Sequence, residues 1–553
     1  MKLIEIKVNN FRGIKGDHNA ISFDKSDIIF LIGQNNVGKS SILKAYDFFI
    51  DSKRKAEKTD FFGYDTSNPI EIEAKFKSEP SDNDDIELNM KGKEPDWISK
   101  WCDNANIIRI RKTWNNVGDI GKKETFDPKC KTWVNGGFGG FDTLLTKYSP
   151  TPLFINAMEN EISLSEKVNK LVQEDFIKKI RQNHGKKFEE LIKGIKELQE
   201  EILGTSEIKN LNDSLNENFK RVFTDLTLKI EQDNDSNIKL EDSFKKNHSI
   251  AVLKDGVDRK ETFLQNGHGI IRQALFNFVS FLKHEKSHSN KKEYIILYEE
   301  PELFLHPKVA FKLRESLYDL VINSQYQVLC ATHSPLMIDL SKPHSSLARI
   351  VKRKDETTNV YQVETSTFDE DSKERLKMII KFNPHVCETF YSDKVLVVEG
   401  DTEVVVYRYL LEHFFKNEEI FVLNAGSKMN IPFFQRILTE FDIEHYIIHD
   451  SDERPEDGKA NAAWTMNKKI WEQVEISNAK HKGIARRYIH SINFEKANKV
   501  SSTGAGKPMD AYNFVKNVTL ESDFECIKWL KDIVGEKNIL HDDKYLESII
   551  TNV

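Results

Sequence analysis

Hydrophobic and polar residues alternate in three early stretches of the chain, and each alternation predicts a β-strand with one buried face. These stretches are residues 2–8, 69–76 and 106–111. Continuous hydrophobic runs instead predict strands that are buried on both faces. Such runs occur at residues 28–32, 294–298, 327–331, 394–398 and 445–449. Because helical patterns separate these runs, we expect an α/β fold.

The pattern changes between about residue 160 and residue 232, where hydrophobic residues recur at steps of three and four between Lys and Glu. This spacing is typical of amphipathic helices. We therefore expect a helical insertion over residues 159–245, which we interpret as an arm for self-association. A solvated helical cap on the same subunit would have the same pattern.

Composition limits the class of protein. The chain has 553 residues, of which 39% are hydrophobic and 31% are charged, with a net charge of -7. The length suits two to four domains, and any surface that binds DNA must be local. The five cysteines are scattered without a C-x-x-C pair, and no hydrophobic run is long enough to span a bilayer, so we expect a cytoplasmic protein without a membrane partner.

Residues 33–41 follow the buried run 28–32 and fit the phosphate-binding pattern G-x-x-x-x-G-K-[ST]. Glycines let successive N–H groups turn toward an anion, the lysine adds a charge, and a hydroxyl can ligate Mg²⁺. The predicted nucleotide-binding residues here are Gly33, Asn35, Asn36, Gly38, Lys39, Ser40 and Ser41, with Ser40 also a metal ligand. Arg12 either reaches a nucleotide phosphate or is an ordinary surface arginine.

Three later segments extend this chemistry. Glu299 and Glu300 end the run 294–298, so the first is predicted to hold Mg²⁺ and the second to orient the attacking water. His333 ends the run 327–331 and is placed to touch a γ-phosphate. The small-residue turn with Asn266, Gly267 and Gly269 opens a helix and is a further candidate anion site.

Paired carboxylates mark a second site near the C-terminus. Glu399 and Glu403 follow the run 394–398, and Asp450 and Asp452 follow the run 445–449. Oxygen ligands at this density suit Mg²⁺ or Mn²⁺, and two such ions roughly 4 Å apart are the usual clamp for in-line attack on a phosphodiester. The alternative is that these acidic strand ends are merely solvated.

Two more residues extend this second site. Glu495 is predicted to complete the metal ligands, and Lys507 to stabilise charge on the phosphate or on the leaving oxygen.

The order of these motifs resembles known families. The phosphate loop, the glycine turn, the segment 299–307 and the segment 331–335 together resemble an ABC-type ATPase of the RecF and SMC kind. The pattern E-G-x-x-E followed by D-S-D resembles a Toprim domain. An ABC ATPase followed by a Toprim domain is the arrangement of the OLD (overcoming lysogenisation defect) family, whose relatives include the nuclease subunit of Gabija anti-phage systems and retron-associated OLD effectors.

The resemblance implies an organisation into parts. Residues 1–158 and 246–370 would form the ATPase around the helical insertion, residues 371–392 a connector, and residues 393–553 the Toprim nuclease domain. It also implies that residues 265–269 act on the ATP of a partner subunit and that His333 is the switch histidine. Glu299 stands where most ATPases of this kind have an aspartate.

The resemblance further implies a function. A member would be a nucleotide-controlled DNA endonuclease that uses ATP and Mg²⁺ or Mn²⁺, works as a homodimer or a higher homo-oligomer, and acts in anti-phage defence. A helicase and a retron reverse transcriptase with its DNA are the alternatives for a further partner. Two other functions stay open: a RecF/SMC-like repair ATPase whose Toprim domain binds DNA without cutting it, and a nucleotide-sensing scaffold for a toxin or partner.

Overall fold

The computed structural model describes residues 1–79, 97–138, 143–157, 293–363, 384–455, 461–501, 506–535 and 541–551, two short strands at 251–253 and 260–262, and a few single positions. The chain divides into two compact units, Met1–Ala157 with Glu285–Val553 and Met158–His284. The predicted helical insertion 159–245 and the turn with Asn266, Gly267 and Gly269 lie outside the described residues.

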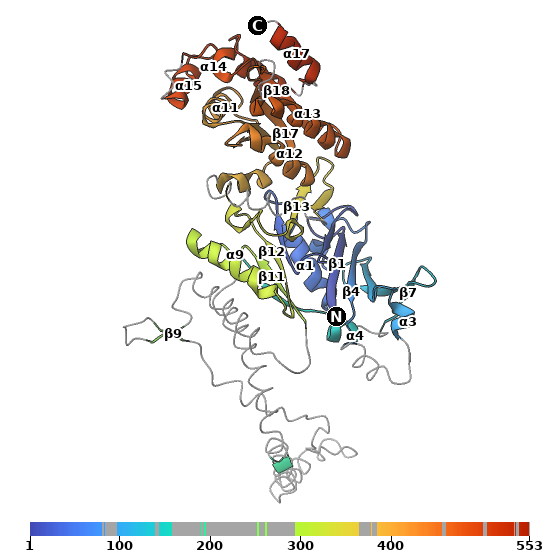
Figure 1. Cartoon of the computed structure of the whole chain (residues 1–553). Helices are drawn as coiled ribbons and strands as arrows, with labels where there is room; N and C mark the ends of the chain where they lie inside the picture. The colour runs from blue at the N-terminus through green and yellow to red at the C-terminus, as the bar shows by residue number, and fades with distance from the viewer. Residues whose placement is uncertain are drawn as a thin grey trace, which may run out of the picture. The chain divides into compact units, whose positions relative to one another are not determined.

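A parallel sheet carries the predicted nucleotide site (Figure 1). All of its strands are parallel except β14 at the edge, which pairs antiparallel with β13. In spatial order they are β14 (Thr358–Gln362), β13 (Leu347–Lys352), β3 (Ile28–Ile32), β12 (Tyr326–Ala331), β11 (Tyr294–Glu299) and β8 (Thr151–Ile155). The hydrophobic runs 28–32, 294–298 and 327–331 are therefore strands of this sheet, as predicted.

Helices cover both faces of the parallel sheet. Helix α1 (Lys39–Ile50) packs with Ile29 and Leu31 of β3 in one hydrophobic core. Phe30, which points to the opposite face, packs against Tyr318 of helix α9 (Pro307–Val321), with the two rings tilted by 41° and their centroids 5.5 Å apart. Burial on both faces explains why β3 is continuously hydrophobic.

An antiparallel sheet lies against the other side of α1 and shares its core. Its strands in spatial order are β2 (Ala20–Ser22), β1 (Lys2–Asn9), β4 (Ile70–Lys77), β5 (Ile107–Trp114), β6 (Lys122–Asp127) and β7 (Thr132–Asn135). Strands β4 and β5 alternate between buried and partly exposed residues, so the predicted alternating strands are confirmed. Short helices α3 (Trp97–Trp101) and α4 (Thr143–Tyr148) complete this part.

The C-terminal part is built on a second parallel sheet. Its strand order is β16 (Ile420–Asn424), β15 (Lys394–Val398), β17 (Glu444–Asp450) and β18 (Ala485–His490). Helices α11 (Asp401–Phe414), α15 (Lys507–Val515) and α16 (Glu525–Val534) share one core with this sheet. The remaining helices are α12 (Ile431–Glu440), α13 (Ala462–Lys480), α14 (Phe494–Ala497) and α17 (Asp543–Thr551).

Arg349 of β13 joins the first parallel sheet to the C-terminal part. Its buried guanidinium donates hydrogen bonds to the carbonyl oxygens of Phe390, Ser392, Phe441 and Asp442 and to the carboxylate of Asp393. Asp393 stands directly before β15. The five N–H donors of this buried guanidinium therefore all have acceptors, and losing one of these acceptors would leave a buried donor of a charged group unsatisfied.

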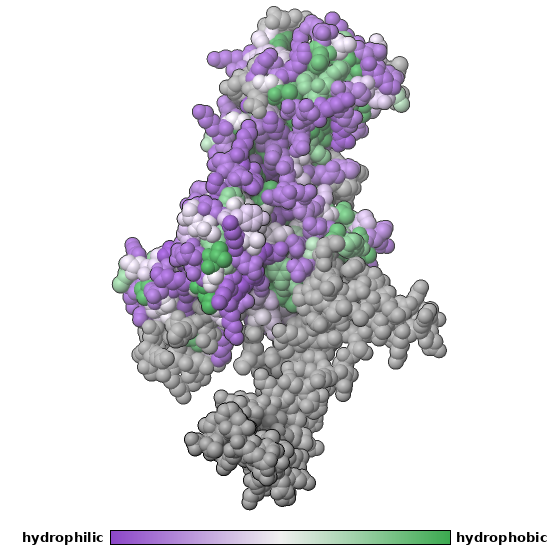
Figure 2. Space-filling view, turned by 180° about the vertical axis from the view of Figure 1, so that it is seen from behind, coloured by the Kyte–Doolittle hydropathy of each residue, from purple (hydrophilic) through white to green (hydrophobic). Residues whose placement is uncertain are grey.

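The described surface is mostly polar. In the view of Figure 2, hydrophilic residues cover most of the coloured surface, and hydrophobic residues form separate patches. None of the helices in the described part of the chain is both long and apolar enough to cross a membrane.

Candidate functional site

The phosphate loop lies at the carboxyl edge of the first parallel sheet. Leu31 of β3 and Glu299 of β11 are both in register with Ala331 of β12, so the three strands end at one level. The residues after these ends therefore meet there, although about 270 positions of the sequence separate the end of β3 from that of β11. This is the usual ligand-binding edge of an open parallel sheet.

Two glycines shape the loop. Gly33 has a φ of 139°, and a Cβ atom there would lie 2.3 Å from the carbonyl oxygen of Ile350. Gly38 has a φ of 107° and precedes helix α1. Only glycine fits both positions, because a side chain would clash or be strained. The loop thus presents its backbone at the N-terminus of α1, as a phosphate site requires.

Lys39, His333 and Glu300 form a line of polar contacts beside this loop. The Lys39 ammonium donates to the carbonyl oxygens of Gly33 and Gln34 at 2.7 and 2.6 Å, and its Nζ lies 3.3 Å from His333 Nδ1. Because a lysine only donates, Nδ1 accepts and the imidazole proton is on Nε2, which lies 3.5 Å from Glu300. Burial lowers the pKa of Lys39 to about 8. Burial and the nearby charge of Lys39 together lower the pKa of His333 to about 4. His333 is therefore neutral at pH 7.

Other predicted nucleotide residues have contacts of their own. Arg12 donates from Nε and Nη2 to the buried carboxylate of Asp60, and its contact with a phosphate stays a prediction. Ser41 Oγ accepts from Gly13 N at 3.3 Å. Glu299 accepts from Ala157 N at 3.3 Å. Asn35 and Asn36 are exposed, and Ser40 is half-buried beside Lys39.

Glu302 is a residue that the motif reading did not single out. Its carboxylate accepts hydrogen bonds from Thr332 Oγ1 at 2.7 Å and from His333 N at 3.2 Å. It thereby ties the end of β12 to the segment after β11. Burial raises the pKa of Glu302, and its Oε2 atom is buried without a hydrogen-bond partner. A third glutamate after a double-glutamate strand end is the signal that could have identified it.

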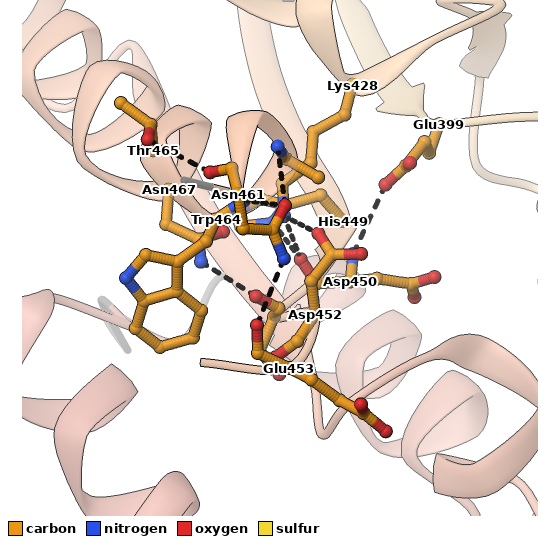
Figure 3. A network of polar contacts seen from close by, with 12 residues as sticks. Glu399, Lys428, His449, Asp450, Asp452, Glu453, Asn461, Trp464, Thr465 and Asn467 are labelled. Carbon is orange, nitrogen blue, oxygen red and sulfur yellow. Dashed lines mark hydrogen bonds and ion pairs between the residues drawn. The ribbon is translucent and has the colours of Figure 1, made fainter. Parts of the chain in front are cut away.

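The second site lies at the carboxyl edge of the C-terminal sheet (Figure 3). Val398 of β15 is in register with Ile448 of β17, so Glu399 and Asp450 emerge side by side. The backbone N–H of Asp450 points at Glu399 Oε2, 3.5 Å away. Glu403 is buried in the first turn of α11. The tertiary structure thus brings together the carboxylates that the sequence separates by about fifty residues.

Burial and mutual repulsion dominate the electrostatics of this site. Burial raises the pKa of Glu403 to about 7, with smaller contributions from the charges of Glu399 and Glu495. Burial likewise raises the pKa of Asp450, and the charges of Glu403, Glu399 and Asp452 add to the effect. Burial also raises the pKa of Glu399. Carboxyl groups with raised pKa values are typical of functional sites.

Two lysines contact this carboxylate cluster, defined as Glu399, Glu403, Asp450, Asp452 and Glu495. Lys507 forms an ion pair of 2.9 Å with Glu495, which raises the pKa of the lysine. Lys428 forms an ion pair with Asp452 and donates to the carbonyl oxygen of Asp450 at 2.6 Å. The resemblance of residues 423–428 to the loop after the second strand of a Toprim domain predicts Lys428 near a phosphate, which stays a prediction; its contacts with Asp450 and Asp452 were not predicted.

The carboxylate cluster fits a divalent cation. Asp450 Oδ1 is buried and has no hydrogen-bond partner, which a bound cation would supply. Within the described residues, no three acidic, histidine or cysteine side chains are already drawn together at ligand distances. The cluster would therefore have to draw its carboxylates closer together around a cation, which would neutralise their mutual repulsion.

Known proteins share this organisation. Residues 1–338 match the AAA ATPase domain family, and residues 390–452 match the family described as Overcoming lysogenization defect protein-like, TOPRIM domain.

Three curated proteins are similar to the chain. The Old nuclease of Escherichia phage P2 is 25% identical over 548 residues, which cover 93% of this chain and 87% of that protein. Endonuclease GajA of Bacillus cereus is 25% identical over 492 residues, which cover 83% of this chain and 76% of that protein. The OLD nuclease of Thermus scotoductus is 23% identical over 232 residues, which cover 40% of this chain and 44% of that protein.

Proposed function

Since the chain belongs to the OLD family, in which an AAA ATPase domain precedes a Toprim domain, we propose that it is a nucleotide-controlled, divalent-metal-dependent DNA endonuclease. The observation that carries the proposal is the convergence of Glu399, Glu403 and Asp450 around a buried carboxylate oxygen that lacks a partner. The names of the relatives, Old nuclease and Endonuclease GajA, support the same reaction.

In this proposal the nuclease site is the carboxylate cluster. Glu399, Glu403 and Asp450, with Asp452 and Glu495, would hold Mg²⁺ or Mn²⁺, which when bound polarises the phosphodiester toward attack by water. Lys507 is half exposed, with 51% of its side chain accessible, so its ammonium can reach a phosphate from the solvent side. It would stabilise negative charge on the phosphate or the leaving oxygen.

The nucleotide site would control this reaction. Lys39 and the backbone of residues 33–38 would bind the ATP phosphates, Ser40 and Glu299 the Mg²⁺, and Glu300 would orient the attacking water. Neutral His333 donates from Nε2 toward Glu300 and can hold that carboxylate in position. Arg12, Asn35, Asn36 and Ser41 complete the proposed phosphate surroundings, and the turn at 266–269 would serve the ATP of a second copy.

A direct connection between the two sites supports control by nucleotide. Gln34 of the phosphate loop donates from Nε2 to Asp393 Oδ2 at 3.1 Å, and Arg349 holds the other oxygen of the same carboxylate. Asp393 immediately precedes β15, whose opposite end leads into Glu399. A movement of the loop on binding ATP therefore has a continuous path to the nuclease site.

The test uses supercoiled plasmid with Mg²⁺ or Mn²⁺, with and without ATP. We expect nicking or linearisation by the wild type and none by Asp450→Ala, while both bind ATP equally. ATP hydrolysis without any cutting would refute the nuclease assignment and favour a DNA repair ATPase. For the proposed anti-phage role, we expect cells that carry the intact gene locus to plate phage poorly and cells with Asp450→Ala to plate it normally.

A further inference from the structure

Lys428 is an unusual residue of the carboxylate cluster because it is a lysine with only 2% of its surface exposed. It begins the short 3-10 helix Lys428–Asn430 that follows β16. Removing an ammonium group from water is costly unless partners compensate for the lost hydration. Its partners lie at the end of β17 and just after it: the Asp450 carbonyl oxygen, at 2.6 Å, and the Asp452 carboxylate.

Hydrogen bonds from other elements also fix residues 450–452, the segment that Lys428 contacts. Asp452 N donates to the carbonyl oxygen of Ile492 at 2.9 Å, and Ile492 N donates to Ser451 Oγ at 2.8 Å. Asn467 donates to the Ser451 carbonyl oxygen at 2.8 Å. Asp452 itself has a φ of 60°, a left-handed backbone conformation that is uncommon for non-glycine residues, although aspartate tolerates it better than most. Lys428 is the contact that fixes this segment from the β16 side (Figure 3).

The charges of the carboxylate cluster divide into two groups. Asp452 and Glu495 are each paired with a lysine, Lys428 and Lys507 respectively. Among the described residues, Glu399, Glu403 and Asp450 form no ion pair with a lysine or an arginine. The positive charge of Lys428 also lowers the pKa of Glu399 and of Asp450, against the larger effect of burial. Lys428 therefore acts on three of the five carboxylates.

We infer that Lys428 is a positioning residue of the nuclease site: a fixed internal cation that orients Asp452 and the end of β17 and offsets part of the negative charge that a divalent ion would otherwise neutralise. This inference rests on the proposed function. It has a distinctive consequence, because the charge of Lys428 acts on metal binding whereas its hydrogen bonds act on the reaction, so losing the residue should strengthen the first and impair the second. Without the Lys428 charge, the remaining carboxylates attract a divalent ion more strongly. Without its hydrogen bonds, Asp450 and Asp452 are no longer aligned for the reaction.

The test measures Mn²⁺ binding by electron paramagnetic resonance on the nucleotide-free full-length protein, alongside plasmid cleavage. We expect Lys428→Met to bind Mn²⁺ at least about tenfold more tightly than the wild type, because one nearby positive charge has been removed, and to cleave at least about tenfold more slowly. A lysine with a merely structural role would not tighten metal binding when lost. Lys428→Arg, which keeps the charge, should have wild-type Mn²⁺ affinity.

Two controls separate the possible failures. Lys416→Met removes the same charge from an exposed lysine just beyond the C-terminal end of α11, whereas the carboxylate cluster adjoins the N-terminal end of that helix. This variant should change neither the Mn²⁺ affinity nor the cleavage rate. Asp450→Ala should bind Mn²⁺ much more weakly than the wild type.

If the wild type has no Mn²⁺ binding that depends on Asp450, the metal site of the proposed function is wrong. If that binding is present but Lys428→Met binds Mn²⁺ no more tightly than the wild type, the inference about Lys428 is wrong. Should Lys428→Met fail to fold, Lys428→Gln gives the same comparison, since its neutral amide can still donate to Asp450.

Discussion

Replacing Glu403 with glutamine should stabilise the metal-free protein at neutral and alkaline pH while abolishing metal-dependent cleavage. Glu403 is buried at the start of α11, near the charges of Glu399 and Glu495. Glutamine has nearly the same shape and no charge, so the substitution removes the repulsion without leaving a cavity. A site that gathers like charges in this way is destabilised until its cation binds.

The size of the effect follows from the pKa of Glu403, which burial raises from 4.5 to about 7. Below pH 4.5 the carboxyl is protonated in the folded and the unfolded protein, and above pH 7 it is ionised in both. Between these values the folded protein retains a proton that the unfolded chain has released, so stability falls as the pH rises. At about 1.4 kcal/mol per pH unit, the full loss above pH 7 is about 3 kcal/mol.

The assay measures the free energy of unfolding by urea in EDTA from pH 5 to pH 8. Hydrogen exchange of the α11 amides is a second measurement, of the local stability of that helix. The free energy of unfolding of Glu403→Gln should exceed that of the wild type by up to about 3 kcal/mol at pH 8, and the difference should shrink toward pH 5. Glu412→Gln, at an exposed position of the same helix, should show no such difference. A difference that is absent at pH 8, or that does not change with pH, would refute the reasoning.

Three further substitutions test other parts of the structure. Lys39→Ala should abolish ATP binding, measured by titration calorimetry, because the loop loses its only full charge; unchanged affinity would contradict the phosphate-loop assignment. Arg349→Met should lower the unfolding free energy by about 3–5 kcal/mol, because it leaves several buried acceptors unpaired. Thermal unfolding of this variant, compared with Arg349→Lys, checks the value. Gln34→Ala should leave ATP affinity within about threefold of wild type but weaken the effect of ATP on plasmid cleavage, since the contact with Asp393 is exposed and contributes little binding energy; unaltered control by ATP would exclude this path.

Much of the fold could be predicted because its strands have strong local patterns. The alternating stretches became β1, β4 and β5, and the continuous hydrophobic runs became β3, β11, β12, β15 and β17. Such patterns arise because the buried faces of a strand need hydrophobic residues, so the order of neighbouring residues indicates which faces are buried. Strand order could not be read in the same way. That β3 lies between β12 and β13 depends on contacts between segments about three hundred residues apart.

The candidate sites show the same distinction between local patterns and contacts of distant segments. The sequence by itself determined the phosphate loop and the acidic strand ends, because the residues of each motif are contiguous and their chemistry depends on spacing. Only the tertiary structure decided that Arg12 pairs with Asp60, that Glu302 binds the end of β12, and that Lys428 holds Asp452. These partners are 24 to 48 residues apart, and the packing of whole elements brings them together. A side chain's partner is set by this packing, which no local pattern along the chain encodes.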